Sequence, residues 1–169
     1  MSELSENKVY QSLRTVLAAV AGISLANVFL IKMEIERNLL FSAFLPALGA
    51  NRTVYFAPEF NQNRAIIGGV MLIGALFTCY VLSNKRWVWM MIAFLIYLID
   101  TWFMIWFIEV GGYSYAEWSL DIIAHVIILA ILLRAAVIGK NRAEKKPVEE
   151  MSQPAEEKTD NKIDYYVDD

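Results

Sequence analysis

Four long apolar stretches take up most of this chain of 169 residues. They cover residues 15–33, 65–83, 87–108 and 120–138. A helix needs about 20 mostly apolar residues to cross the hydrocarbon core of a bilayer, with a range of roughly 17–25. Inside that core the backbone satisfies its own hydrogen bonds only as a helix or a closed barrel. The sequence therefore predicts an all-α integral membrane protein with four transmembrane helices in a bundle.

The composition supports a membrane protein and excludes several other classes. Hydrophobic residues make up 57% of the chain and its mean hydropathy is +0.42, whereas soluble domains have about 45–50% apolar residues. Lys and Arg lie near the ends of the apolar stretches and form no basic face, so we expect no nucleic-acid partner. One His and one Cys exclude zinc fingers, cysteine-based iron–sulfur sites and bis-His haem ligation within one chain. We expect the lipid bilayer as a partner, and no cofactor or metal.

The distribution of Lys and Arg predicts the topology. Basic residues precede the first span, fill the turn between the second and third spans, and follow or end the fourth span: Lys8, Arg14, Lys85, Arg86, Arg134, Lys140, Arg142, Lys145 and Lys146. The loop 110–119 has none. The positive-inside rule then places both termini in the cytoplasm, even though scattered basic residues also occur in the first external loop. We expect a multi-pass protein, most simply of the cell membrane.

Three segments outside the spans complete the predicted organisation. Residues 1–14 form a polar cytoplasmic N-terminus before the membrane domain 15–138. Residues 139–169 are polar and hold two of the four prolines, which predicts a disordered cytoplasmic tail. In the first external loop, the apolar run 39–45 is too short to cross the bilayer. We expect it to lie in the membrane interface or to re-enter the membrane.

Polar side chains in three of the spans form a candidate site. A charge in hydrocarbon is costly, so ionisable residues within spans are functional candidates. At 1.5 Å per residue, Asp100 lies roughly 12 Å and His125 roughly 8 Å below the outer ends of their spans, a level that Asn27 in the first span shares. Asp121 lies one helical turn before His125, and Glu109 lies at the outer mouth. If the helices pack together, these groups meet inside the bundle.

The candidate site has two interpretations. In one, Asp100 and His125 share a proton or hold a cation in a polar pocket that opens outward. In the other, they make an interhelical bond that only fixes the packing of the helices, and such bonds average about 0.6 kcal/mol in one well-measured membrane protein. A metal site built from these carboxylates and one imidazole has no diagnostic spacing, so we predict none.

Small residues recur every four positions in two spans. Ala18, Gly22 and Ala26 do so in the first span, and Ala65 and Gly69 in the second. Such stripes let two helix backbones approach closely. We expect them to pack within the chain, and the alternative is a face for a homodimer.

The chain lacks the common motifs for phosphate binding, zinc proteolysis and serine hydrolysis. The first hypothesis is therefore a non-enzymatic accessory or assembly subunit that associates with itself or with a larger membrane complex. The second is a small proton- or cation-linked transporter or channel subunit that uses Asp100 and His125. The third is an intramembrane lipid-modifying enzyme in which Asp100, Asp121 and His125 act as acid–base or metal groups.

Overall fold

The structure is a computed structural model of the chain, and it describes residues 3–33, 35, 39–50 and 62–152. The described residues form helices and no strands, which confirms the predicted all-α fold. The helices in chain order are α1 (Glu3–Lys32), α2 (Phe44–Ala50), α3 (Gln62–Leu82), α4 (Val88–Gly111) and α5 (Ser119–Ser152).

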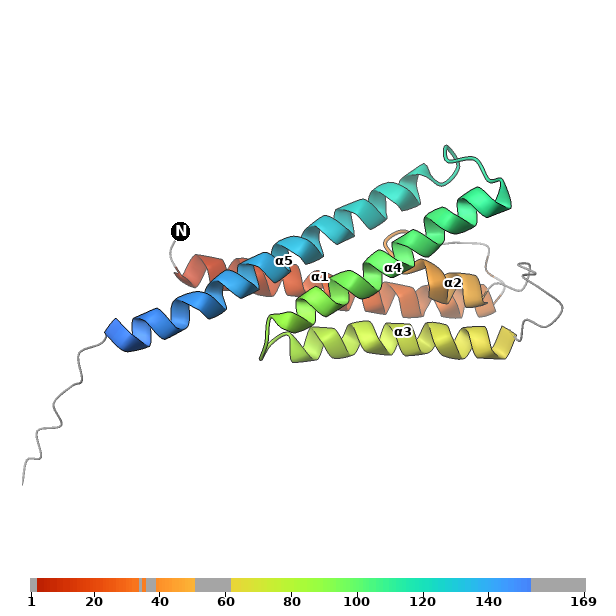
Figure 1. Cartoon of the computed structure of the whole chain (residues 1–169). Coiled ribbons are helices and arrows are strands. Elements are labelled where there is room, and N and C mark those ends of the chain that lie inside the picture. Colours follow the sequence, from red (N-terminus) through yellow and green to blue (C-terminus); the bar gives the residue numbers. More distant parts are fainter. Residues whose placement is uncertain (1–2, 34, 36–38, 51–61, 153–169) are drawn as a thin grey trace, which may run out of the picture.

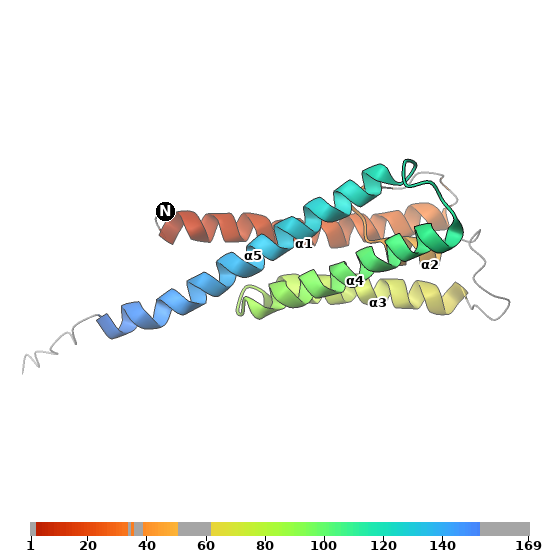
Figure 2. The ribbon, with the colours of Figure 1, turned by 45° about the horizontal axis from the view of Figure 1, so that its top comes forward.

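The four long helices form a bundle in which each one packs against two others. α1 contacts α3 and α5, and α4 also contacts α3 and α5. The short helix α2 contacts α1, α3 and α4, and it lies at the end of the bundle away from the N-terminus (Figures 1 and 2). Three long helices thus surround a short one that belongs to the connection between α1 and α3.

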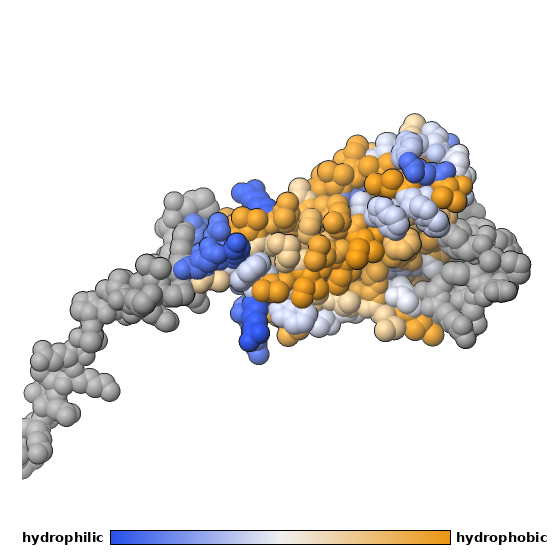
Figure 3. All heavy atoms as spheres, viewed as in Figure 1, coloured by the Kyte–Doolittle hydropathy of each residue, from blue (hydrophilic) through white to orange (hydrophobic). Residues whose placement is uncertain are grey.

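Three of the helices are long and apolar enough to cross a membrane. These segments are Ser5–Lys32, Val88–Gly111 and Ser119–Glu144. The apolar part of α3, Ile66–Leu82, is shorter, so the predicted count of four crossings stays a prediction. Figure 3 shows apolar surface along the middle of the bundle and hydrophilic surface near its two ends, as expected of a protein that lies in a bilayer.

Two helices extend beyond the predicted membrane spans. α1 begins at Glu3, so most of the predicted polar N-terminus 1–14 is helical. α5 continues to Ser152, so the prediction of disorder from residue 139 is wrong for 139–152, and residues 153–169 lie outside the described part. Adding a turn to an existing helix needs no new nucleation, and the pair Lys140–Glu144 at 3.7 Å has the spacing that supports a helix.

The re-entrant segment, residues 39–50 between α1 and α3, turns back into the bundle. Of the predicted apolar run 39–45, Ala43 and Phe44 are buried, and α2 buries Pro46 and Gly49 further along. Pro46 lies in the first turn of α2, where a missing backbone N–H breaks no helical hydrogen bond. Phe41 has a left-handed backbone with φ 68°, which is strained for a residue other than glycine and turns the chain inward.

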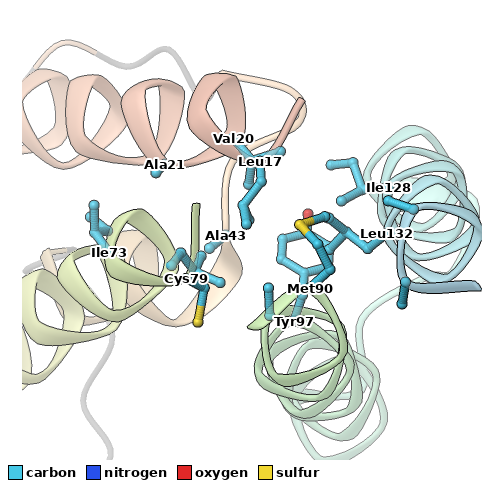
Figure 4. Packing of buried hydrophobic residues seen from close by; sticks show 14 of the residues in the cluster. Leu17, Val20, Ala21, Ala43, Ile73, Cys79, Met90, Tyr97, Ile128 and Leu132 are labelled. Atoms are coloured by element: carbon cyan, nitrogen blue, oxygen red, sulfur yellow. The ribbon is translucent and has the colours of Figure 1, made fainter. Parts of the chain in front are cut away.

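A large buried cluster joins the long helices below this segment. Figure 4 shows side chains from the long helices and from Ala43 meeting in the bundle interior; among them are Leu17, Val20, Ile73, Cys79, Met90, Tyr97, Ile128 and Leu132. Close packing between helices is a main source of stability in a bilayer, because lipid tails are as apolar as the core. The cluster includes Ala43 and Tyr97, so it borders the polar residues around α2.

The small residues of the two stripes face different surroundings. Gly69 of α3 lies against α2: a Cβ atom there would meet the Cα of Pro46 at 2.8 Å. The side chain of Ala65 lies outside the described part. On α1, Gly22 and Ala26 are exposed and Ala18 is half-buried, and a Cβ at Gly22 would meet no other atom within 4 Å. The expectation of packing within the chain therefore agrees with Gly69 but not with Gly22 and Ala26, because α1 turns other residues toward its neighbours.

Candidate functional site

Asp100 of α4 is fully buried and caps the first turn of α2. Its Oδ2 accepts the backbone N–H of Phe44 at 2.7 Å, and its Oδ1 accepts that of Leu45 at 2.8 Å. The first N–H groups of any helix have no partner within that helix, and a negative charge beside them is favourable. A side chain 56 positions away in sequence thus supplies the cap that α2 cannot supply itself.

His125 of α5 lies beside the same carboxylate. Its Nε2 is 3.4 Å from Oδ2 of Asp100, and its Nδ1 is 2.8 Å from the backbone oxygen of Asp121. The His125 ring also stacks on Tyr97, with centroids 5.1 Å apart. A carbonyl oxygen only accepts hydrogen bonds, so Nδ1 carries a proton in this contact, and Nε2 can donate toward Asp100 only when the ring is fully protonated.

Two polar side chains of α1 hold the stretch of chain that leads into α2. Asn27 accepts the backbone N–H of Leu39 at 3.1 Å and donates to the hydroxyl of Ser42 at 3.0 Å. Ser24 accepts the backbone N–H of Ala43 at 2.7 Å. Buried backbone N–H groups are costly without a partner, and these bonds supply partners for an irregular segment inside the bundle.

The predicted polar residues therefore meet in part. Asn27, Asp100 and His125 all lie around the re-entrant segment, and Asp121 lines the same pocket as Asn27 and His125. Glu109 is exposed, and its carboxylate accepts a hydrogen bond from the hydroxyl of Tyr115 at 3.0 Å, so it does not join the other four. Partial desolvation, together with this carboxylate, raises the pKa of Tyr115.

A pocket of about 220 Å³ opens beside these groups. Its polar lining consists of Asn27, Ser42, Asp121 and His125. Aromatic rings form much of the remaining wall, where Phe44 and Phe107 lie 5.4 Å apart and Tyr113 and Trp118 lie 6.1 Å apart. A small molecule with an apolar body and a polar or charged group has the chemistry that such a lining accepts.

Three residues of this region do not stand out in the sequence. They are Ser24, Ser42 and Tyr97, although Ser24 lies one helical turn before Asn27 and shares its buried face. A second polar residue at that spacing is a usable signal. Nothing in the pattern marks Tyr97, whose hydroxyl is buried without a hydrogen-bond partner among the residues that the structure describes.

The described part of the chain contains no group of three His, Cys, Asp or Glu side chains placed to hold a metal ion. Comparisons of the chain with protein-family models, with characterised proteins and with solved structures find no match.

Proposed function

We propose that this chain is a non-enzymatic multi-pass membrane protein that acts as an accessory or assembly subunit, and that it associates through α1. The observation that carries the proposal is the outward position of Gly22 and Ala26 on that helix. Lipid contact favours large apolar side chains, whereas small residues in a row let another helix approach closely. Because no described helix of this chain occupies that face, a second copy or another membrane protein is its natural occupant.

The hydrogen bonds of the buried polar side chains support the same proposal. Both oxygens of Asp100 accept backbone N–H groups, and Asn27 likewise holds backbone and side chain of the re-entrant segment. Carboxylates and amides engaged in this way stabilise a structure and have little freedom to act on a substrate. We therefore assign a structural role to Asp100.

We place the protein in the cell membrane with four crossings and both termini in the cytoplasm. The basic turn between α3 and α4 lies at the same end of the bundle as the beginning of α1 (Figure 1). This arrangement supports the orientation that the positive-inside rule predicts.

The test compares two exposed glycines. Gly22→Leu fills the proposed face on α1, and Gly74→Leu adds the same volume at another exposed helical position, where an added Cβ would also meet no other atom within 4 Å. We expect the wild-type chain in mild detergent to form oligomers or to co-purify with a membrane partner. Gly22→Leu is expected to lose that association and Gly74→Leu to keep it. A wild-type chain that is monomeric at all concentrations and has no co-purifying partner would contradict the proposal.

A proton- or cation-linked subunit is the second candidate. The observation in its favour is that His125 and Asp121 both line the outer pocket while His125 touches the buried Asp100. Reconstituted vesicles with a pH-sensitive dye inside test it. Asp121→Asn is expected to abolish a pH-driven flux without unfolding the chain, since the carboxylate of Asp121 accepts no hydrogen bond from the described residues. The absence of flux in the wild type would remove this candidate.

A further inference from the structure

A second cavity lies at the opposite end of the bundle from the polar site. It has a volume of about 360 Å³ and is lined by three elements: the first turns of α1, the α3–α4 turn with the start of α4, and α5 near Gly139. Three of its lining side chains are cations, namely Lys85, Arg86 and Arg142, and the described residues contribute no carboxylate to the lining. The cavity is therefore a concave region of positive charge.

The packing of Tyr10 and Gly139 builds this cavity. The hydroxyl of Tyr10 donates to the backbone oxygen of Ser83 at 2.9 Å, which joins α1 to the end of α3. Gly139 brings α5 close to both neighbours, because a Cβ there would lie 2.7 Å from the Cβ of Trp87 and 2.9 Å from the Tyr10 ring. The cavity is thus bounded by fixed contacts between three helices.

Arg142 is positioned to bind an anion. Its guanidinium carbon lies 5.1 Å from the centre of the Tyr10 ring. A cation–π contact with the ring does not use the N–H groups of the guanidinium as hydrogen-bond donors to another group, and these N–H groups match the oxygens of phosphate. Among the described residues, no hydrogen bond or ion pair engages those N–H groups.

Arg14 adds to the positive charge beneath the cavity. It is buried, donates from Nε to the backbone oxygen of Tyr80 at 3.2 Å, and donates from Nη1 to the amide oxygen of Asn84 at 3.0 Å. These partners are neutral, so they orient the guanidinium without cancelling its charge. A buried charge is screened less by salt than an exposed one.

The level of the cavity identifies the source of the anion. The cavity lies where α3 ends at Leu82 and α4 begins at Val88, so it borders the apolar band at the depth of the headgroups. Trp87 lines it, and tryptophan favours that depth. The exposed side chains of Val81 and Val88 offer apolar surface beside it for acyl chains.

We propose that this cavity binds the phosphate of an anionic phospholipid, with Arg142 as the main ligand and Lys85 and Arg86 as supporting cations. Basic pockets between transmembrane helices recognise anionic headgroups through this combination of charge and hydrogen bonding. The proposal is independent of the association face on α1.

The experiment counts bound lipid on the purified full-length chain by native mass spectrometry. Phosphatidylglycerol is compared with phosphatidylcholine and with inorganic phosphate. We expect bound phosphatidylglycerol to survive delipidation and Arg142→Gln to weaken its binding roughly tenfold. The matched control is Lys140→Gln, which removes the same charge from an exposed position on the same helix that does not line the cavity. Circular dichroism verifies that each variant is folded. If Arg142→Gln does not fold, Lys85→Gln replaces it as the test variant, because Lys85 lines the same cavity.

Three results would overturn the proposal. Equal binding of phosphatidylcholine would show that the cavity does not select an anion. An equal loss in Lys140→Gln and Arg142→Gln would show that the general surface charge attracts the lipid and that the cavity is not a site. Competition by inorganic phosphate at concentrations similar to those of the lipid would identify a site for a soluble anion.

Discussion

The carboxylate of Asp100 and the backbone nitrogen of Phe44 lie 2.7 Å apart, so an acid in the middle of a helix long and apolar enough to cross a membrane caps a short helix from another part of the chain. The same carboxylate accepts a second N–H, from Leu45, and lies beside the ring of His125. The acid that is most costly to bury is thereby the group that unites α2, α4 and α5.

Asp100→Asn is expected to destabilise the chain by about 2 kcal/mol. The substitution replaces one acceptor oxygen with an NH₂ group, so that one buried backbone N–H faces another donor. For a chain of this size the loss corresponds to a melting temperature about 4–8 °C lower, measured by thermal unfolding in detergent. Asp121→Asn is the control and should melt closer to the wild type, because the carboxylate lies in the first turn of α5 but accepts no hydrogen bond from the described residues. A wild-type melting temperature for Asp100→Asn would mean that the cap contributes nothing.

Asn27→Ala is expected to loosen the segment that leads into α2. It removes the acceptor for the N–H of Leu39 and the donor to Ser42. Hydrogen–deuterium exchange of peptides that cover 39–45 should become roughly tenfold faster, because about 1.4 kcal/mol of local stability is lost. Glu109→Gln changes an exposed group away from the segment and should leave the exchange unchanged. Equal exchange in all three proteins would show that other contacts hold the segment.

Gly69→Ala and Gly68→Ala are expected to have opposite effects on stability. The new methyl group at position 69 would meet the Cα of Pro46 at 2.8 Å, and forcing apart α2 and α3 costs about 1–3 kcal/mol. The methyl group at position 68 meets no atom within 4 Å, so the better helix propensity of alanine should add about 0.5–1 kcal/mol. The measurement is the melting temperature of each variant by thermal unfolding in detergent, compared with that of the wild type. Similar melting temperatures would refute the close approach of α2 to α3.

Tyr97→Phe is expected to stabilise the chain by about 1 kcal/mol. The hydroxyl is buried without a hydrogen-bond partner among the described residues, and removing it relieves the cost of burying a polar group. The stack on His125 needs only the ring. Tyr10→Phe is the matched comparison, since its hydroxyl donates to Ser83 and its loss should cost about 1 kcal/mol. A lower melting temperature for Tyr97→Phe would show that its hydroxyl makes a hydrogen bond in the folded protein.

The sequence indicated that Asp100, His125 and Asn27 lie at one level of the bundle, but it determined neither their meeting nor their partners. Burial in hydrocarbon is too costly for an isolated acid, so a partner inside the protein was expected for Asp100, while its identity depended on how the helices pack. The main partners of Asp100 are backbone N–H groups, which nearly every residue carries and no sequence pattern distinguishes. Their position depends on the path of the connection between α1 and α3, which tertiary packing decides.

Two further features could not be predicted from the sequence: where the helices end, and which faces of the helices pack against each other. The polar composition after residue 138 indicated disorder, but a helix that is already formed extends through Lys140 and Glu144 at little cost. Gly22 and Gly69 each lie four positions from another small residue, and this spacing is compatible with close packing in both helices. Which face of a helix meets its neighbours depends on rotation about its axis, and four-residue spacing alone does not determine that rotation.

The cap on α2 also constrains the order of assembly. Phe44 is synthesised before Asp100, and 56 positions separate the two in sequence. Until α4 is inserted, the first turn of α2 has no acceptor for two of its N–H groups within the membrane. The first turn of α2 therefore completes its hydrogen bonds only after α4 has been made and has packed against it.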